Sequence, residues 1–386
     1  MINIAIIPAR GGSKGIINKN LQKIGGLSLV AKAIRVCFKS KKFNEIFVST
    51  DSPEIAKESK NHGAKIIIRP KDLAKDTTST DPVISHAIEY IEKIGINFNY
   101  ISLIQATYPF LTTEQIKKVV SSLKDPFDCA FASSNFHGFI WENSQNGFVL
   151  ANRDHNFKVR PRRQDQQKQF LELGSIYVIK KSAFLKSKSR FGTNPYPVII
   201  ENTVPIEIDN YFDLEICRSL VESKNNPFLK TLMKKIKHII TDFDGVLTDN
   251  TVFTDSNGIE SVICNKSDSL SIGIMRSRYN IKFDILTSEE SKTHQHRAKK
   301  MGLNIHVAKK GKADSIRKIL NEANNKKEGT LYIGNDLNDL DAFHYVEYVF
   351  CPNDSHKDVQ FKSDIILNSK GGQGIFRELL IALESS

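Results

Sequence analysis

The sequence predicts an α/β protein with two doubly wound domains, in which helices cover both faces of a mainly parallel sheet. Short apolar runs of strand length alternate with amphipathic segments of helix length through both halves of the chain. Two of these runs, near residues 4–8 and 238–241, are followed by clusters of glycine and charged residues. With 386 residues the chain is long enough to bury two separate cores.

A polar, turn-forming stretch divides the two halves. Residues 223–227 read SKNNP and lead into the lysine-rich segment 230–237. We therefore expect a first domain over residues 1–226, a linker over 227–236 and a second domain over 237–386.

In the first half the pattern predicts alternating strands and helices. A buried strand at residues 4–7 ends at Pro8, which cannot donate to a ladder. The elements expected after it are a helix over 28–40, a strand over 45–50, a helix over 53–62, a strand over 64–68, a helix from about Pro82 and a strand over 100–104. Strands that alternate with helices in this way imply a parallel sheet wound by right-handed crossovers. Ligands bind at the carboxyl ends of the strands in such a sheet.

Composition indicates a soluble globular protein of a reducing compartment. Apolar residues make up 40% of the chain and charged residues 25%, and no apolar run approaches the length of a membrane span. The five cysteines are scattered without paired spacing, which favours reduced thiols. The chain begins directly with a strand pattern rather than a secretory leader. We expect a cytoplasmic protein without a membrane partner.

The net charge of +12 raises the question of nucleic-acid binding. The lysines, however, are spread along the chain, without a long basic block or an aromatic RNA-binding motif. We therefore expect anionic small substrates and no nucleic acid.

The loop after the first strand is the best candidate for a phosphate site. Its glycines tolerate positive φ, which can turn successive backbone N–H groups toward one anion. The spacing matches neither the P-loop nor the dinucleotide fingerprint. The residues concerned are Arg10, Gly11, Gly12, Ser13, Lys14, Gly15, Lys19 and Asn20. Three cations among three glycines predict a triphosphate site.

This stretch, IAIIPARGGSKGIINKN at residues 4–20, resembles the signature of the CMP-sialic acid synthetases, or N-acylneuraminate cytidylyltransferases. In that family the loop holds the triphosphate of CTP. The resemblance implies a Rossmann-like nucleotidyltransferase domain, CTP contacts from the loop residues just named, and a catalytic role for Lys19.

Residues 69–81 form the next polar loop of this half. From the residues alone, the cluster TTSTD at 77–81 is an N-cap for the following helix. The resemblance instead places Arg69, Ser79 and Thr80 near the cytidine, and both interpretations can hold together.

The sugar-acid side is expected beyond residue 104. QATYPF at 105–110 resembles the family's Gln-Pro-Thr-Ser-Pro, without the arginine that usually follows, and implies that Gln105 faces the sugar acid. The basic run RPRRQD at 160–165 is either a solvated surface or, by counting back from Gly174, the family segment in which Arg163 contacts the acid's carboxylate or the triphosphate. Tyr177 and Phe191 are further sugar-acid contacts by resemblance, with a core role as the alternative. Gln166 and Leu173 depart from the family pattern, so the acid can differ as well.

A metal site is predicted near residue 208. Glu207 and Asp209 alternate along an expected strand, which points both carboxylates to one face, as Mg²⁺ requires. Asp213 is expected to cap the following helix.

The second half opens with HIITDFDGVLTD at residues 238–249. The segment resembles the nucleophile motif of haloacid-dehalogenase-type (HAD) phosphatases. The resemblance implies that Asp242 attacks phosphorus and that Asp244 protonates the leaving oxygen, with Mg²⁺ between nucleophile and phosphate.

The remaining parts of that motif set follow in order. Thr287 ends a strand and can hold the phosphoryl group, and Lys312 opens a helix as the phosphate-neutralising lysine, with Lys309 and Lys310 as rivals. In GNDLND at 334–339, Asn335 stands where the family commonly has a metal-binding aspartate. Asp242 and Asp244 are expected to hold the metal, and Asn335 or Asp336 completes the site. Asp339 is expected to position this loop.

The second domain has no room for a large cap. Residues 251–264 predict a hairpin with its turn at 255–258. This resembles the capless phosphatases of Kdo and nonulosonate phosphates, which assemble as tetramers, and implies a homo-oligomer, dimer or tetramer.

Together the two resemblances imply a bifunctional enzyme. The first domain would transfer CMP from CTP to a nonulosonic acid, and the second would release such an acid from its 9-phosphate, both with Mg²⁺. Three alternatives stay open: a cytidylyltransferase whose second half is an inactive oligomerisation module, a Kdo cytidylyltransferase/phosphatase, and a nucleotide-sensing regulator.

Overall fold

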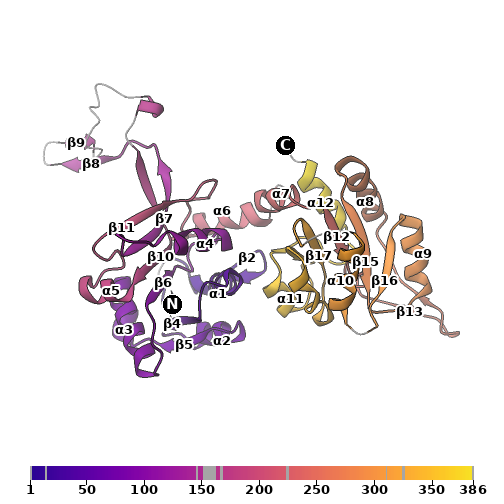
Figure 1. Cartoon of the computed structure of the whole chain (residues 1–386), viewed down its shortest axis with the longest axis horizontal. Coiled ribbons are helices and arrows are strands. Elements are labelled where there is room, and N and C mark those ends of the chain that lie inside the picture. The colour runs from indigo at the N-terminus through magenta and orange to yellow at the C-terminus, as the bar shows by residue number, and fades with distance from the viewer. Residues whose placement is uncertain are drawn as a thin grey trace. The chain divides into compact units, whose positions relative to one another are not determined.

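The fold is described from a computed structural model. It describes residues 2–13, 15–144, 147–150, 162–165, 168–222, 226–309, 311–323 and 327–384. Contacts divide the chain into two compact units, which are considered separately below (Figure 1). The first comprises residues 1–22 and 28–214, and the second comprises residues 23–27 and 215–386.

The first unit is built on a seven-stranded sheet with the order β11-β7-β10-β6-β1-β4-β5. Its strands are β1 (Asn3–Pro8), β4 (Glu45–Thr50), β5 (Lys65–Ile68), β6 (Tyr100–Ile104), β7 (Cys129–Phe136), β10 (Gln169–Lys180) and β11 (Pro195–Ile199). The small pairs β2 (Lys23–Ile24) with β3 (Leu27–Ser28) and β8 (Trp141–Ser144) with β9 (Gly147–Leu150) lie outside this sheet. The doubly wound class predicted from the alternation is confirmed, because β1 pairs in parallel with both β4 and β6.

One strand departs from the expected parallel arrangement. β10 runs antiparallel to both of its neighbours, β6 and β7. The described residues between β7 and β10 contain no α-helix, so no crossover unit returns the chain to the parallel direction there. A register shift lies between Glu172 and Tyr177, around Gly174, whose φ is +63°.

Helices α1 (Leu29–Ser40), α2 (Pro53–Asn61) and α3 (Thr80–Lys93) lie where the sequence predicts them. The helices α4 (Thr113–Ser122) and α5 (Lys181–Ser187) are not among those predicted, and α6 (Tyr211–Glu222), with Asp213 in its first turn, is the helix expected at the end of this unit. Local signals set their starts: the Ser28 side chain accepts the Ala31 N–H at α1, and Ser52 with Pro53 begins α2. Ile4 and Ile6 of β1 join a core cluster with apolar residues of α3, while the alternating Ala5 and Ile7 are fully buried as well.

The strand expected around residues 204–209 is not formed, so that prediction is wrong. The segment is irregular up to α6. The Ile208 N–H donates to the Thr107 carbonyl (2.9 Å), and the Val204 carbonyl accepts from the Tyr108 hydroxyl (2.9 Å). Its polar groups are thus bonded to the loop after β6 rather than to the edge of a sheet. Asp213 accepts the N–H groups of Asp209 and Asn210 (2.9 and 3.0 Å), as expected for a helix cap.

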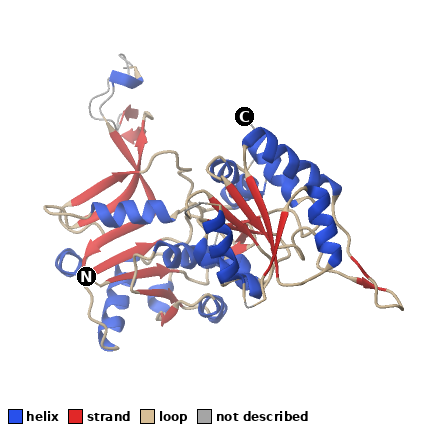
Figure 2. Cartoon of the chain, turned by 45° about the vertical axis from the view of Figure 1, so that its right-hand side comes forward, coloured by secondary structure: helices blue, strands red, loops and turns tan. Residues whose placement is uncertain are grey.

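The second unit has a fully parallel six-stranded sheet with the order β16-β15-β12-β17-β18-β19. Its strands are β12 (His238–Thr241), β15 (Lys282–Thr287), β16 (Asn304–Val307), β17 (Thr330–Ile333), β18 (Tyr348–Cys351) and β19 (Ile365–Ile366). Its helices are α7 (Pro227–Met233), α8 (Lys266–Tyr279), α9 (Lys292–Met301), α10 (Lys312–Glu322), α11 (Lys357–Lys362) and α12 (Ile375–Glu384). Figure 2 shows these helices around the strands.

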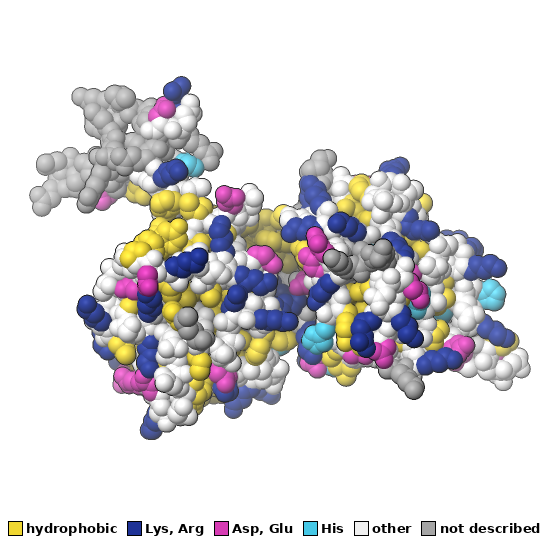
Figure 3. Space-filling model, viewed as in Figure 1, with side chains coloured by type: hydrophobic (Ala, Val, Ile, Leu, Met, Phe, Trp, Pro, Cys, Tyr) yellow, Lys and Arg dark blue, Asp and Glu magenta, His cyan; other side chains and the backbone are white. Residues whose placement is uncertain are grey.

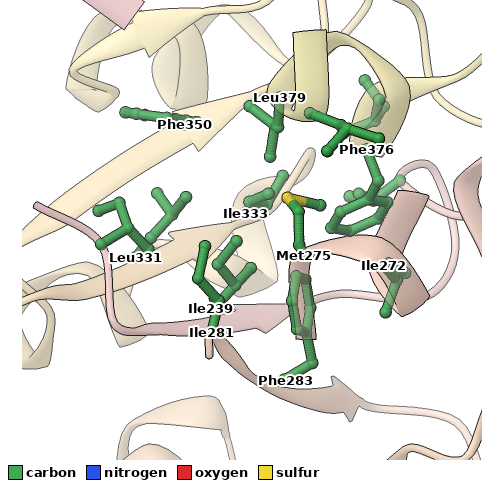
Figure 4. Close-up of a cluster of buried hydrophobic side chains, with 14 of the residues drawn as sticks. Ile239, Ile272, Met275, Ile281, Phe283, Leu331, Ile333, Phe350, Phe376 and Leu379 are labelled. Carbon is green, nitrogen blue, oxygen red and sulfur yellow. The ribbon is translucent and has the colours of Figure 1, made fainter. Parts of the chain in front are cut away.

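Helices cover both faces of the second sheet. On one face Ile239, Leu331 and Ile333 pack with residues of α7, α8 and α12 (Figure 4). On the other face Ile240 and Tyr332 pack with residues of α10 and α11. Strand residues that are buried on both faces read as continuous apolar runs, which is why the sequence pattern locates them.

Two parts of the second unit bear on the sequence predictions. Within the proposed linker, α7 buries Leu229 and Met233 in the core of this unit, and the exact domain boundary stays a prediction. The predicted hairpin is confirmed: β13 (Phe253–Thr254) pairs antiparallel with β14 (Glu260–Ser261) around Asp255.

Two surface properties accompany this fold. On the face seen in Figure 3, Lys and Arg side chains are scattered among acidic ones over both units. None of the helices in the described part of the chain is long and apolar enough to cross a membrane.

Candidate active sites

The first candidate site lies where the carboxyl ends of β1, β4 and β6 meet. Because these strands are parallel neighbours, the loops that follow them lie at one edge of the sheet. The loop after β1 contributes the predicted phosphate-binding residues, and the Gly11 N–H donates to Asp51, which follows β4 (3.0 Å). Lys14 lies outside the described residues.

The glycines of this loop are predicted to turn backbone N–H groups toward an anion, and that role stays a prediction. Gly11 and Gly12 do not have positive φ. A Cβ on Gly11 would lie 2.9 Å from the Ser52 Cβ, and one on Gly15 would lie 2.6 Å from the Asp209 carbonyl oxygen. At these two positions glycine permits close approach of other segments, whereas Gly12 has open space around it.

Arg10 and Lys19, the two described cations of the loop, each have an acidic neighbour. Arg10 forms an ion pair with Asp76, and the Lys19 Nζ lies 3.2 Å from an Asp209 carboxylate oxygen and 2.8 Å from the Ile208 carbonyl. Asn20 is buried and donates to the Arg10 carbonyl (3.0 Å), which fixes the loop. Ser13 is half-buried.

Of the residues expected at the cytidine, Arg69 is the most constrained. Its side chain is 5% exposed and donates to the Ser49 hydroxyl (3.2 Å) and the Ser49 carbonyl (2.7 Å). Burial, with the charge of Arg10, lowers its pKa to about 10 although Asp51 opposes this, so the guanidinium stays protonated at neutral pH. Ser79 is the N-cap residue of α3 without a capping side-chain bond, and Thr80 begins the helix.

Gln105 and Glu207 converge on one wall of the site. A Cβ on Gly174 would lie 2.8 Å from the Glu207 Oε2 and 3.3 Å from the Gln105 Nε2. The Thr107 hydroxyl donates to the Glu207 carboxylate (2.7 Å). The register shift of β10 at Gly174 therefore leaves the space that these two side chains occupy.

The aromatic residues predicted for the sugar side are packed together. Phe191 meets the Tyr177 ring edge-on (centroids 5.5 Å apart), and the Arg190 guanidinium lies over that ring at 5.6 Å. The Tyr177 hydroxyl donates to Glu172, and burial followed by this bond raises the pKa of Tyr177. Tyr177 is 1% exposed and belongs to the core cluster, and Phe191 packs against that cluster. Both rings therefore contribute to the core of this unit.

Glu207 and Asp209 could hold a divalent cation despite the absence of a strand. Lys19 contacts Asp209, and the charge of Asp209 acts on Glu207. Burial, with Asp209, raises the pKa of Glu207 in spite of the Thr107 hydrogen bond. Two hard carboxylate ligands beside a triphosphate loop fit Mg²⁺. Arg163 begins a short helical turn, residues 163–165, but its side chain lies outside the described part, as do Arg160 and Gln166.

The second candidate site lies at the carboxyl ends of β12, β15 and β17. Lys312 is fully buried, and its Nζ lies 2.7 Å from the Asp242 Oδ2 and 2.6 Å from the Asp339 Oδ1. The other Asp242 oxygen accepts the Phe243 N–H (2.8 Å). Burial and the charge of Asp339 raise the pKa of Asp242, and Lys312 offsets part of this rise. The rival Lys309 is exposed beside Glu290 (3.7 Å), and Lys310 lies outside the described residues.

Asp339 organises the acidic loop after β17, as expected. It accepts the N–H groups of Asn335 (2.7 Å) and Asp336 (3.1 Å) as well as the Tyr332 hydroxyl (2.6 Å). The Asn335 Oδ1 is buried and has no hydrogen-bond partner in the described part of the chain. A buried, unpaired amide oxygen fits a cation ligand, whereas Asp336 is exposed and caps the turn at Leu337 (2.7 Å). Gly245, with a φ of +74°, makes room for the Asn335 amide nitrogen, which a Cβ would meet at 1.9 Å.

Asp244 is held from two sides. The Thr248 hydroxyl donates to its Oδ1 (3.2 Å), and the His294 Nε2 lies 3.3 Å from its Oδ2. Single ligand atoms of Asp244, Glu289 and His294 all lie within 4.8 Å of one another. Thr287 is 2% exposed at the end of β15 and accepts the Glu289 N–H (3.1 Å).

Sequence reasoning missed several of these residues. His294, Glu289 and Glu172 carry no motif, because each reaches a site through the fold rather than through spacing. Thr248 could have been found from the sequence, since it lies four residues after Asp244 in the same loop. A threonine hydroxyl at that distance can form a local hydrogen bond back to the loop.

Comparison with known proteins matches the two halves separately. Residues 4–215 match the family described as cytidylyltransferase, and residues 260–379 match the family described as haloacid dehalogenase-like hydrolase. The second match begins after Asp242 and Asp244.

Individual relatives match either nearly the whole chain or a part of it. The chain is 27% identical over 380 residues to N-acylneuraminate cytidylyltransferase A of Danio rerio, covering 97% of this chain and 86% of that protein. It is 31% identical over 228 residues to the post-translational flagellin modification protein B of Campylobacter coli, covering 58% of this chain and 96% of that protein.

Among solved structures, the cobalt-bound deoxy-D-mannose-octulosonate 8-phosphate phosphatase of Haemophilus influenzae is similar to this chain. It shares 30% identity and covers 39% of this chain and 91% of its own, with a TM-score of 0.37. The family itself is established by the first match, which spans more than half of the 386 residues. The chain belongs to the cytidylyltransferase family.

Proposed function

We propose that the first unit transfers CMP from CTP to a nonulosonic, sialic-type acid and releases pyrophosphate. The observation that carries this proposal is the convergence of Lys19, Asp209, Glu207 and Gln105 from separate segments on one edge of the sheet. The relatives named N-acylneuraminate cytidylyltransferase support the acid class.

In this proposal the chain's residues bind and orient the reactants. Arg10 and Lys19 neutralise the triphosphate, Arg69 lies toward the nucleoside, and Gln105 contacts the acid. The anomeric hydroxyl oxygen attacks the α-phosphorus and its proton passes to solvent, the bond from that phosphorus to the bridging oxygen breaks, and pyrophosphate leaves. Mg²⁺ held by Glu207 and Asp209 would supply charge neutralisation for the leaving pyrophosphate.

The test is pyrophosphate release from CTP and Mg²⁺ with a panel of free acids: N-acetylneuraminate, KDN, legionaminate and Kdo. Release with one nine-carbon acid supports the proposal and identifies the substrate, while release with Kdo alone favours the Kdo enzyme instead. No release with any acid contradicts it. Chelation of Mg²⁺ should stop the reaction, and Glu207→Gln should raise the Mg²⁺ concentration required.

We further propose that the second unit is a Mg²⁺-dependent phosphatase acting on a sugar-acid 9-phosphate. The carrying observation is the buried group formed by Asp242, Lys312 and Asp339, next to the unpaired Asn335 Oδ1. Asp242 attacks phosphorus, the bond from phosphorus to the sugar oxygen breaks, and Asp244 gives its proton to that oxygen. Water then hydrolyses the aspartyl phosphate and returns a proton to Asp244. Asp242 and Asn335 would hold Mg²⁺, which would supply charge neutralisation for the phosphoryl group.

Asp242→Asn separates the two activities. It should abolish phosphate release and leave CMP transfer unchanged, because Asp242 belongs to the second unit alone. Loss of both activities together would contradict the two-site proposal. Absence of phosphate release from the wild-type protein, with CMP transfer intact, would favour the alternative of an inactive oligomerisation module.

Homo-oligomer formation and a cytoplasmic location belong to the same proposal. Val252, Phe253, Ile259 and Ile263 on the hairpin are each more than half exposed, which supports a subunit contact there. Sedimentation of the full chain, compared with Phe253→Ser, tests this.

A further inference from the structure

His294 is a buried imidazole that has no part in the phosphatase reaction proposed above for the second unit. Its side chain is 2% exposed, and it belongs to α9, outside all the motifs singled out in the sequence. Its ring stacks on Phe243 with centroids 3.9 Å apart and planes at 25°. Phe243 lies between Asp242 and Asp244 in the chain, so the orientation of the imidazole is tied to the nucleophile loop itself.

The Nε2 of His294 faces the proton donor of the proposed reaction. It lies 3.3 Å from the Asp244 Oδ2, while Thr248 holds Oδ1 from the other side at 3.2 Å. Thr248 is itself fixed, because its hydroxyl oxygen accepts the Gly245 N–H (3.2 Å) and the Asn250 N–H (3.3 Å). The Asp244 carboxyl group therefore contacts Thr248 through one oxygen and His294 through the other, which defines its plane, and single ligand atoms of Asp244, His294 and Glu289 all lie within 4.8 Å of one another.

A core role does not account for this histidine. Buried imidazoles in a core normally satisfy both ring nitrogens, but the Nδ1 here is buried without a hydrogen-bond partner in the described part of the chain. Since Nδ1 has no partner that fixes the tautomer, Nε2 can donate to an Asp244 carboxylate or accept from an Asp244 carboxyl group. The residue fits both states through which Asp244 passes during proton transfer.

We propose that His294 is a positioning residue that holds Asp244 for protonation of the leaving sugar oxygen. This inference rests on the proposed phosphatase function. In the step concerned, the bond between Asp242 and phosphorus forms, the bond from phosphorus to the sugar oxygen breaks, and the Asp244 proton moves to that oxygen. His294 does not exchange atoms with the substrate; it keeps the Asp244 carboxyl directed at the leaving group.

The leaving group supplies the test. A sugar alkoxide needs a proton as it departs, whereas p-nitrophenolate departs without one, so a defect in proton donation shows only with the sugar phosphate. The quantity to compare is kcat/KM, which covers the reaction up to departure of the leaving group. His294→Phe keeps a ring on Phe243 but removes the nitrogen, and His294→Gln restores a donor and acceptor near the Nε2 position.

We expect His294→Phe to lower kcat/KM for N-acetylneuraminate 9-phosphate or Kdo 8-phosphate about 10²-fold and for p-nitrophenyl phosphate less than about 3-fold. His294→Gln should recover most of the loss. The matched control is His296→Gln, because His296 is exposed on the same helix and its Nδ1 contacts the Lys292 carbonyl (2.9 Å). CMP transfer and thermal unfolding of each variant report whether the chain is folded.

Equal losses with both substrates, or no recovery in His294→Gln with a folded chain, would overturn the positioning role. An unchanged kcat/KM in His294→Phe would do the same. A wild-type protein that hydrolyses neither substrate would instead overturn the phosphatase proposal, on which this inference depends.

Discussion

The two candidate sites place their charges in opposite environments. In the first, the Lys19 and Asp209 side chains are 16% and 72% exposed, and Arg10 and Asp76 are each about 30% exposed. In the second, Lys312 and Asp339 are fully buried and Asp242 nearly so. Exposed pairs contribute little to stability, whereas a buried charge that loses its partner is costly.

This difference teaches how each site is completed. The charges of the first site are loosely paired and available to a polyanionic substrate, which can replace the acidic neighbours. The charges of the second site are already in place within the fold and change little when a phosphate binds. Activity and stability should therefore separate in the first site and fall together in the second.

The largest effect is expected at Lys312. In Lys312→Met, Asp242 and Asp339 become buried carboxylates without a counter-charge, so the second unit should lose about 3–5 kcal/mol of unfolding free energy. Phosphate release should fall by about 10³-fold, since the phosphate also loses its cation. Denaturant unfolding and phosphate release measure the two effects. Lys309→Met, at an exposed lysine nearby, is the control and should change neither.

Lys19→Ala should break the first site without breaking the fold. We expect CMP transfer to fall about 10²–10³-fold because the triphosphate loses a positioned cation. The free energy of unfolding should change by less than about 1 kcal/mol, since the Asp209 side chain is 72% exposed and water solvates it when Lys19 is lost. Lys65→Ala, which removes an exposed pair with Glu45 (2.7 Å) elsewhere in the same unit, is the matched control. A large loss of stability in Lys19→Ala alone would erase the contrast between the sites.

A third test uses a buried acid of the second unit outside the catalytic group. Asp284 is contacted by His238 (2.7 Å), His306 (3.1 Å) and Asn304 (3.1 Å). Burial alone would raise its pKa, but these hydrogen bonds outweigh burial and hold the pKa well below the usual range. A lowered pKa means stability that is present above the unfolded-state pKa of about 3.9 and lost as the pH falls further.

Asp284→Asn should therefore lower the free energy of unfolding by about 2 kcal/mol at neutral pH. The difference from the wild type should shrink below about pH 4, where the unfolded wild-type chain takes up the proton. Unfolding curves of the variant and the wild type, recorded from about pH 3 to about pH 7, measure this difference in unfolding free energy. A difference in unfolding free energy that grows on acidification would contradict the expected direction of the pH dependence.

The smallest effect distinguishes two glycines of the first loop. Gly15→Ala places a Cβ 2.6 Å from the Asp209 carbonyl oxygen and should destabilise the first unit by about 1–3 kcal/mol. Gly12→Ala meets nothing within 4 Å and should stay within about 0.5 kcal/mol of the wild type. Thermal unfolding of the two ligand-free variants measures the difference. Equal shifts in the unfolding temperature would mean that the contact with Asp209 is not the reason for a glycine at position 15.

Local pattern was enough for much of this molecule. Residues 45–50 and 100–104 form strands with the predicted bounds, because apolar runs of that length between polar turns have few other solutions. The family resemblance and the helix that follows Lys312 pointed to this lysine, and the structure places its Nζ 2.7 Å from the Asp242 Oδ2. Pattern failed at residues 204–209, where alternating polar and apolar residues dock on a loop instead of forming a strand. Alternation of polar and apolar residues indicates which side of a segment is buried, but it does not identify the part of the chain against which that side packs.

The sequence by itself determined the class of fold, the order of strands and helices, and the residues that end the strands at each site, because these depend on short-range periodicity and on spacing along the chain. The tertiary structure alone decided that β10 runs antiparallel, that Gly11 and Gly15 serve close approach, and that His294 faces Asp244. These features join residues far apart in the chain, and such contacts leave no period or spacing in a single sequence.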